Sequence, residues 1–136
     1  MHPADCEHLP AAGALRGSVI VLHGYGASGA LHAQDGRMFA ARGVEVLLPD
    51  APGHGCRDDG RLAKLAQLDD GPRRAAILDI ARQWIPEVRM LAAERRARGA
   101  RRIIVVGTSM GGFTALGALR APRVLDGVAA LLTSPE

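Results

Sequence analysis

Residues 103–113, IIVVGTSMGGF, decide the fold because they join a predicted strand to a predicted helix through a serine flanked by glycines. The branched apolar residues predict a buried strand over 102–106, and a helix is expected over 110–120. Ser109 and the glycines two positions on either side of it fit the pattern G-x-S-x-G, in which a sharp, strained turn presents a serine hydroxyl. We therefore interpret Ser109 as a nucleophile; the alternative is a glycine-rich turn that opens a phosphate-binding helix.

Three further apolar segments predict strands, and helical segments separate all of the strands along the chain. The predicted strands are 18–22, 44–48, 102–106 and 127–133, and the predicted helices are 29–42, 61–70, 73–98 and 110–120. Strands that are apolar throughout and alternate with helices indicate a parallel sheet covered on both faces. The expected fold class is therefore α/β, with three layers and a mostly parallel sheet of about four strands.

The helix predicted over 73–98 is the clearest one, because its apolar residues recur every three or four positions and form one stripe. The stripe consists of Ile77, Ile80, Trp84, Val88 and Leu91. Pro86 lies inside this helix and should remove one backbone hydrogen bond and kink it.

Length, composition and charge indicate one globular domain. The 136 residues predict a single domain, 1–136, in which 1–16 is an N-terminal extension of uncertain structure. Apolar residues make up 48% of the chain, which excludes a disordered protein, and the 3% of aromatic residues predict an aliphatic core. The net charge is +3, and arginines cluster in 95–102, RRARGARR. We interpret this cluster as the solvated end of a helix, whose dipole favours cations, and expect no nucleic-acid partner.

The cysteines and the first residues indicate the cellular setting. Cys6 and Cys56 form no zinc-ligand spacing and no disulfide framework, so no metal and no cofactor are expected. The start, MHPADCEHLP, lacks the basic and apolar regions of a signal peptide, and no apolar run reaches the length of a membrane span. The prediction is a reduced, cytoplasmic protein without a membrane partner.

Loops that carry polar motifs follow the first three predicted strands directly. Residues 23–25, HGY, end the first strand, residues 50–55 follow the second, and Ser109 follows the third. Ligands of parallel sheets bind beyond the carboxyl ends of the strands, so these loops are expected to meet at one edge. The backbone N–H groups of Tyr25 and Met110 would then hold an oxyanion that develops beside Ser109.

The segments HGYGASG (23–29), VLLPDAPGHG (46–55) and GTSMGG (107–112), in this order, resemble the α/β-hydrolase family. More narrowly, they are similar to bacterial esterases near the dienelactone hydrolases and the prolyl-oligopeptidase-like peptidases. The resemblance covers residues 17–136. It implies a mostly parallel sheet and hydrolysis of a small acyl ester, with Ser109 as the nucleophile and Tyr25 and Met110 as backbone oxyanion donors.

The chain departs from that family after the nucleophile. The family places its catalytic acid and histidine downstream of the serine, but only 27 residues follow Ser109 and none is histidine. The family strand order would leave a 4-3-5-6 core with the C-terminal strands absent. The resemblance therefore implies an incomplete hydrolase domain, the N-terminal half of a serine esterase, that is inactive or very weakly active as it stands.

Several residues elsewhere in the chain are candidates to replace the missing triad members. His54 is the best stand-in for the base because its loop lies at the expected edge; the alternative is that His54 and Asp50 only shape that loop. His23 is expected to bond to backbone and shape its own loop. Glu136 follows the last predicted strand, whereas Asp126 precedes that strand and so lies at the wrong end of the sheet.

Two other functions remain open beside ester hydrolysis. One is a non-catalytic protein that keeps the scaffold for binding or self-association. A phosphate or nucleotide binder is less favoured, because the glycine-rich segments lack the Lys-Ser/Thr pair of a P-loop. A sheet that ends at its sixth strand exposes an apolar edge, so a homo-oligomer or a complementing fragment is expected there.

Overall fold

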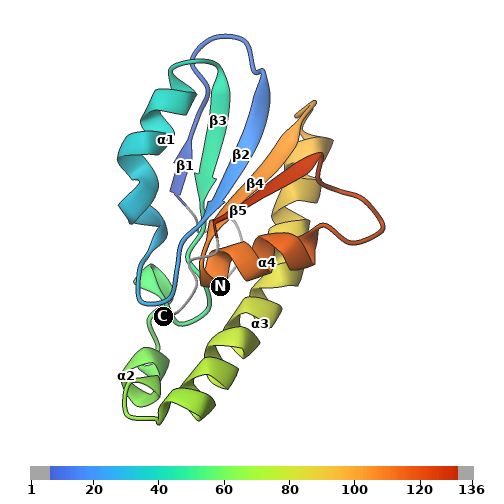
Figure 1. Cartoon of the computed structure of the whole chain (residues 1–136). Coiled ribbons are helices and arrows are strands. Elements are labelled where there is room, and N and C mark those ends of the chain that lie inside the picture. The colour runs from blue at the N-terminus through green and yellow to red at the C-terminus, as the bar shows by residue number, and fades with distance from the viewer. Residues whose placement is uncertain (1–6, 132–136) are drawn as a thin grey trace.

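The computed structural model describes residues 7–131 and shows a five-stranded sheet between two layers of helices (Figure 1). The spatial order of the strands is β1-β3-β2-β4-β5. Their bounds are β1 Glu7–Leu9, β2 Gly17–Leu22, β3 Val44–Leu48, β4 Ile103–Thr108 and β5 Gly127–Leu131. The last four are parallel to one another, and β1 is antiparallel to β3. The predicted α/β class and the mostly parallel sheet are confirmed.

The helices divide unequally between the two faces of the sheet. The α-helices are α1 Ala33–Ala40, α2 Arg61–Leu65, α3 Asp70–Ala97 and α4 Met110–Ala118, with 3₁₀ turns η1 Gly29–His32 and η2 Gly55–Arg57. Helices α3 and α4 pack together over one face, whereas α1 covers only β3 and β1 on the other (Figure 1). On the side of α1, therefore, no helix of the described chain covers β4 and β5.

Three details differ from the sequence expectations. Strand β1 was not predicted, because EHL has no apolar run of its own; it pairs with β3 and contacts α1. The helix expected over 61–70 is only five residues long, and α3 begins at Asp70 instead of residue 73. As predicted, Pro86 lies inside helix α3, where it has no N–H to donate to the preceding turn. Residues 132 and 133 of the last predicted strand lie outside the described residues.

The core lies between the sheet and the layer of α3 and α4. It is mainly aliphatic, as predicted, and Trp84 of α3 is its largest fully buried side chain. Burial alternates along β4, so one row of its side chains enters this core and the other row faces the side of α1. On β5 the outward row is exposed, and Leu131 retains 60% of its accessible surface.

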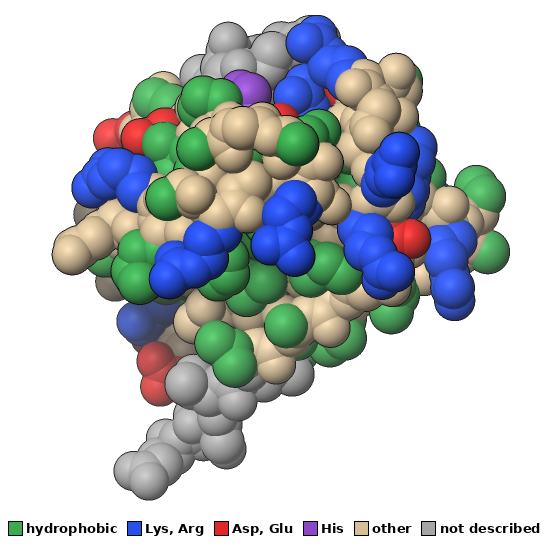
Figure 2. Space-filling model, turned by 90° about the horizontal axis from the view of Figure 1, so that it is seen from above, with side chains coloured by type: hydrophobic (Ala, Val, Ile, Leu, Met, Phe, Trp, Pro, Cys, Tyr) green, Lys and Arg blue, Asp and Glu red, His purple; other side chains and the backbone are tan. Residues whose placement is uncertain are grey.

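Basic side chains are spread over the face formed by the amino ends of the parallel strands, and few acidic ones lie among them (Figure 2). Arg95 and Arg96 lie in the last turn of α3, where Arg95 pairs with Glu45 at 3.7 Å and Arg96 with Asp126 at 2.8 Å. Asp126 also accepts the N–H of Ile103 at 2.8 Å, and this bond and Arg96 lower the pKa of Asp126. Asp126 thus belongs to the edge opposite Ser109, as its position in the sequence indicated.

Candidate active site

Ser109 occupies a strained turn between β4 and α4. Its backbone angles are φ 53° and ψ −116°, and it alone among the non-glycine residues in 7–131 has a positive φ. Such a conformation costs about 1–3 kcal/mol when a side chain is present. The turn is held by the Ser109 N–H, which donates to the Leu131 carbonyl at 2.8 Å, and by the Ser109 carbonyl, which accepts the Gly112 N–H at 2.9 Å. The strained turn predicted from G-x-S-x-G is therefore present.

The glycines around Ser109 allow backbone segments to touch. A Cβ on Gly107 would lie 2.1 Å from the Gly111 carbonyl oxygen. A Cβ on Gly111 would lie 2.4 Å from the Leu22 oxygen and 2.6 Å from the His23 oxygen. No side chain fits at those distances, so both positions need glycine for the start of α4 to pass β4 and the end of β2.

The loop after β2 lies against the turn of Ser109. A Cβ on Gly24 would stand 3.6 Å from the Ser109 Cβ and 3.6 Å from the Thr108 oxygen, which is van der Waals contact. Within residues 7–131, the N–H of Tyr25 has no hydrogen-bond acceptor. Met110 is the first residue of α4, and its N–H is one of those that a helix leaves without an internal acceptor. The HGYG loop and the serine turn therefore meet at one edge, as their places after parallel strands indicated.

Asp50 organises the loop after β3. Its Oδ1 accepts the Gly29 N–H at 2.7 Å, and its Oδ2 accepts the Cys56 N–H at 3.0 Å and the Cys56 thiol at 2.9 Å. Gly55 has φ 53°, and a Cβ there would lie 2.2 Å from the Asp50 carboxylate. Burial opposes ionisation of Asp50, but these hydrogen bonds outweigh it and hold the pKa of the carboxyl below its ordinary value.

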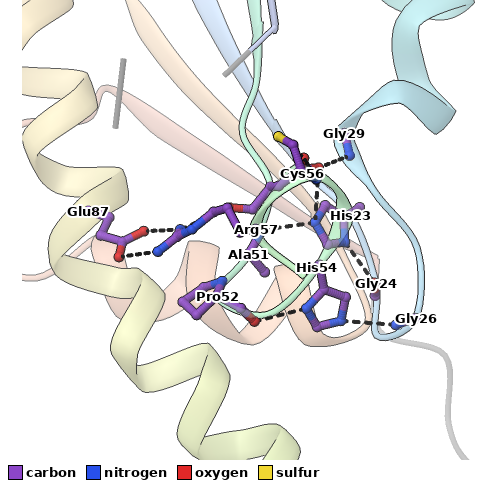
Figure 3. A network of polar contacts seen from close by, with 11 residues as sticks. His23, Gly24, Gly26, Gly29, Ala51, Pro52, His54, Cys56, Arg57 and Glu87 are labelled. Atoms are coloured by element: carbon purple, nitrogen blue, oxygen red, sulfur yellow. Dashed lines mark hydrogen bonds and ion pairs between the residues drawn. The ribbon is translucent and has the colours of Figure 1, made fainter. Parts of the chain in front are cut away.

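His23 and His54 are both fully buried, and both rings bond to backbone (Figure 3). His23 Nε2 accepts the Ala51 N–H at 3.0 Å, and its Nδ1 lies 2.8 Å from the Gly24 oxygen. His54 Nε2 accepts the Gly26 N–H at 3.0 Å, and its Nδ1 lies 3.0 Å from the Pro52 oxygen. The interpretation that His23 shapes its loop is confirmed. His54 has no ring nitrogen left for Ser109, so its loop-shaping role is favoured over a role as base.

A profile of the alpha/beta hydrolase family matches residues 19–135. The chain belongs to the alpha/beta hydrolase family. Its sheet order agrees with this family, because β3-β2-β4-β5 reproduces the expected 4-3-5-6 core. The resemblance inferred from the three motifs is thereby confirmed at the level of the family.

Relatives of this alpha/beta hydrolase include proteins named as esterases. Over 100 residues the chain is 35% identical to Esterase YjfP of Escherichia coli (strain K12), a match that covers 73% of this chain and 38% of that protein. The crystal structure of esterase PE8 is 27% identical, with a TM-score of 0.67, and the match covers 96% of this chain and 65% of that one. TT1662 of Thermus thermophilus shares the fold, with a TM-score of 0.68 at 23% identity over 93% of this chain and 54% of that one.

Further features of the chain lie at the carboxyl edge of the sheet. Arg57 donates to both carboxylate oxygens of Glu87, at 2.6 and 3.0 Å, and so ties the loop after β3 to α3 (Figure 3). Leu62 and Leu65 of α2 and Ile77 of α3 are partly buried and pack against the core, as does Tyr25. No helix within residues 7–131 is long and apolar enough to cross a membrane. Glu136 and Cys6 lie outside the described residues.

Sequence reasoning missed the exchange of bonds between the two histidine loops. The sequence predicts that His23 shapes its own loop and that His54 either shapes its loop or stands in as a base; in the structure each ring also binds the backbone of the other loop. The available signal was the pair of His-Gly steps, at 23–24 and 54–55, each placed just beyond a strand.

Proposed function

We propose that this chain supplies the nucleophile and the oxyanion hole of a serine esterase. Ser109 is the nucleophile, and the N–H groups of Tyr25 and Met110 are the oxyanion donors. The observation that carries the proposal is the strained backbone of Ser109 at the start of α4, with Gly24 so close that a Cβ on Gly24 would stand 3.6 Å from the Ser109 Cβ. Strain of this kind persists where the surrounding fold imposes it, and it is concentrated at active sites.

In the proposed reaction, Ser109 Oγ attacks the ester carbonyl carbon and forms a new C–O bond. The carbonyl electron pair moves to oxygen, where the two N–H groups stabilise the negative charge. Collapse of this intermediate breaks the bond to the alcohol and leaves an acyl group on Ser109, which water then releases. The serine proton must pass to a base, and both buried histidines at this edge are already engaged by backbone.

We infer that the triad acid and histidine are not supplied by residues 7–131, so that the 136-residue chain alone is inactive or very weakly active. No histidine follows Ser109 in the sequence. An oxyanion hole and binding without the triad retain a rate about 10³–10⁴ above that in water. Carboxylic esters are the proposed substrates, in line with the names of Esterase YjfP and esterase PE8.

A fluorophosphonate probe tests the proposal, because it reacts covalently with activated serines. The expected result is slow labelling of the chain that disappears in Ser109→Ala. Lack of labelling in the unchanged chain, or equal labelling of the variant, would exclude an activated Ser109.

We also propose that the edge of β5 with which no other strand of residues 7–131 pairs binds a second polypeptide, either another copy of this chain or a complementing fragment. Leu131 of β5 is 60% exposed, and Phe113 and Leu116 of the adjacent helix α4 are 49% and 48% exposed. An unpaired strand edge next to apolar side chains is a template for strand addition. This surface also favours the second candidate function, a self-associating scaffold. The pairing would be contradicted if sedimentation velocity shows a monomer at all concentrations and no complex forms when a complementing fragment is added.

A further inference from the structure

The loop after β2 and the loop after β3 each contribute a histidine whose ring binds the backbone of the other loop (Figure 3). His23 belongs to the first loop and accepts the N–H of Ala51 in the second, at 3.0 Å. His54 belongs to the second loop and accepts the N–H of Gly26 in the first, also at 3.0 Å. We call this pair of reciprocal bonds the histidine interlock. The centroids of the two imidazole rings lie 5.1 Å apart, so the two rings are neighbours.

The interlock requires one protonation state and one tautomer of each ring. Each Nε2 faces an N–H group and must therefore be an acceptor without a proton. Each Nδ1 consequently carries the proton and donates it to a carbonyl, that of Gly24 for His23 and that of Pro52 for His54. Protonation of Nε2 would set two N–H groups against each other and break the bond.

The bonds of the two histidines restrain the residues on both sides of the Tyr25 N–H. The bond to the Gly26 N–H restrains the peptide group between Tyr25 and Gly26. On one side, Gly24 lies near Ser109, since a Cβ on Gly24 would stand 3.6 Å from the Ser109 Cβ, and the Gly24 carbonyl accepts the N–H of the His23 ring. On the other side, the Gly26 N–H is bound by His54. The Tyr25 ring also meets the His54 ring edge-on, with centroids 5.9 Å apart. Rotation of the peptide group that carries the Tyr25 N–H would have to break the bond between its Gly24 carbonyl and the His23 ring.

We propose that His54 is a positioning residue of the esterase site, which as a neutral acceptor of the Gly26 N–H holds the Tyr25 N–H in place for the oxyanion. The inference rests on the proposed function, since it gives the Tyr25 N–H a catalytic task. It also implies that the Tyr25 N–H stabilises the oxyanion less well in acid, because protonation of His54 releases the Gly26 N–H and with it the oxyanion donor.

The groups around His54 keep its ring neutral near neutral pH. Burial lowers the pKa of His54, the bond to the Pro52 carbonyl and the charge of Asp50 oppose this, and Arg61 at the start of α2 lowers it further. His23 and Tyr25, both in the loop after β2, face the His54 ring. Burial likewise lowers the pKa of His23, against the bond to Gly24. Release is therefore expected only in acid, below the ordinary histidine value of 6.5.

Two variants separate positioning from simple packing. In His54→Gln the side-chain amide oxygen can reach the place of Nε2 and accept the Gly26 N–H without titrating. In His54→Leu the acceptor is lost at similar volume. His8→Gln is the matched control, since His8 is partly exposed on β1 beside Glu45. The measured quantity is the rate constant of fluorophosphonate labelling of Ser109 from pH 5 to pH 8, with the unfolding midpoint as a check on folding.

We expect labelling of His54→Leu to be slower by about ten-fold or more, since loss of an oxyanion donor costs about 10²–10³ in rate. His54→Gln should label within about three-fold of the unchanged chain at neutral pH and should not share its acid decline. His8→Gln should match the unchanged chain throughout. Equal rates for the leucine variant, or the same acid decline in the glutamine variant, would overturn the proposal. If the leucine variant does not fold, the glutamine pH profile decides.

An NMR measurement distinguishes failure of this inference from failure of the proposed function. If the unchanged chain is not labelled at all, the proposed function fails, and ¹⁵N spectra of the imidazoles then decide the interlock alone. The interlock requires His54 as the neutral Nδ1–H tautomer and a Gly26 amide shift that follows His54 titration. An Nε2–H tautomer, or a Gly26 amide indifferent to that titration, would overturn it.

Discussion

The backbone at Ser109 predicts an unusual order of stability for two substitutions. At φ 53° and ψ −116° a residue with a Cβ is strained, whereas glycine adopts this region freely. Ser109→Ala keeps the Cβ and so keeps a strain of about 1–3 kcal/mol. Ser109→Gly removes that strain but gives the unfolded chain an entropy advantage of about 0.5–1 kcal/mol. The glycine variant should therefore be more stable than the alanine variant by about 0.5–2 kcal/mol.

Urea denaturation and calorimetry measure this difference in the free energy of unfolding. For a chain of this length, the difference corresponds to a melting temperature higher by about 2–8 °C in the glycine variant. Ala93→Gly is the matched control, because Ala93 is exposed inside α3, where glycine should cost about 1 kcal/mol. The reasoning is refuted if Ser109→Ala is as stable as Ser109→Gly, or more stable, while the control behaves as expected.

Three other substitutions or conditions test the remaining contacts. Gly111→Ala places a Cβ 2.4 Å from a carbonyl oxygen at the end of β2, so it should lower the free energy of unfolding by about 1–3 kcal/mol. Gly71→Ala, with no atom within 4 Å of the new Cβ, should raise the free energy of unfolding by about 0.5–1 kcal/mol. If denaturation curves show the same change in this free energy for both variants, the prediction for Gly111→Ala is contradicted. The folded pKa values of His23 and His54 lie below 6.5, so their contribution to stability should be complete above pH 6.5 and decline below it, which denaturation from pH 4 to pH 8 checks. Leu131→Lys adds a charge at the free edge of β5 and should weaken self-association in sedimentation velocity, and unchanged association would exclude that edge.

The sequence predicted the scaffold because its signals are local. Continuous apolar runs predicted the four parallel strands, and the glycines around Ser109 predicted the strained turn that the structure contains. The apolar runs predict strands because a parallel sheet is buried on both faces. The glycines predict the turn because a Cβ on Gly107 or Gly111 would collide with nearby backbone. The inference that three loops meet at one edge followed from parallel topology alone.

The missed features depend on partners distant in the chain. Strand β1 has no apolar pattern of its own and exists through its pairing with β3. The roles of His23 and His54 depend on which backbone N–H each ring faces across a separation of 28 residues. The tertiary fold determines which group lies beside a residue so far away in the chain. The sequence alone therefore left several roles open for each histidine.

The most direct test of the central claim is to trap an acyl group on Ser109. Deacylation also needs a base to activate water, and no base is expected from residues 7–131, so an acyl-enzyme should accumulate once formed. We predict that incubation with p-nitrophenyl acetate leaves an acetyl group on the peptide that contains Ser109, and that peptide mass spectrometry finds none at this position in Ser109→Ala. An unmodified Ser109 peptide, with acetylation only at Lys64 or the amino terminus, would contradict the assignment of Ser109 as the nucleophile.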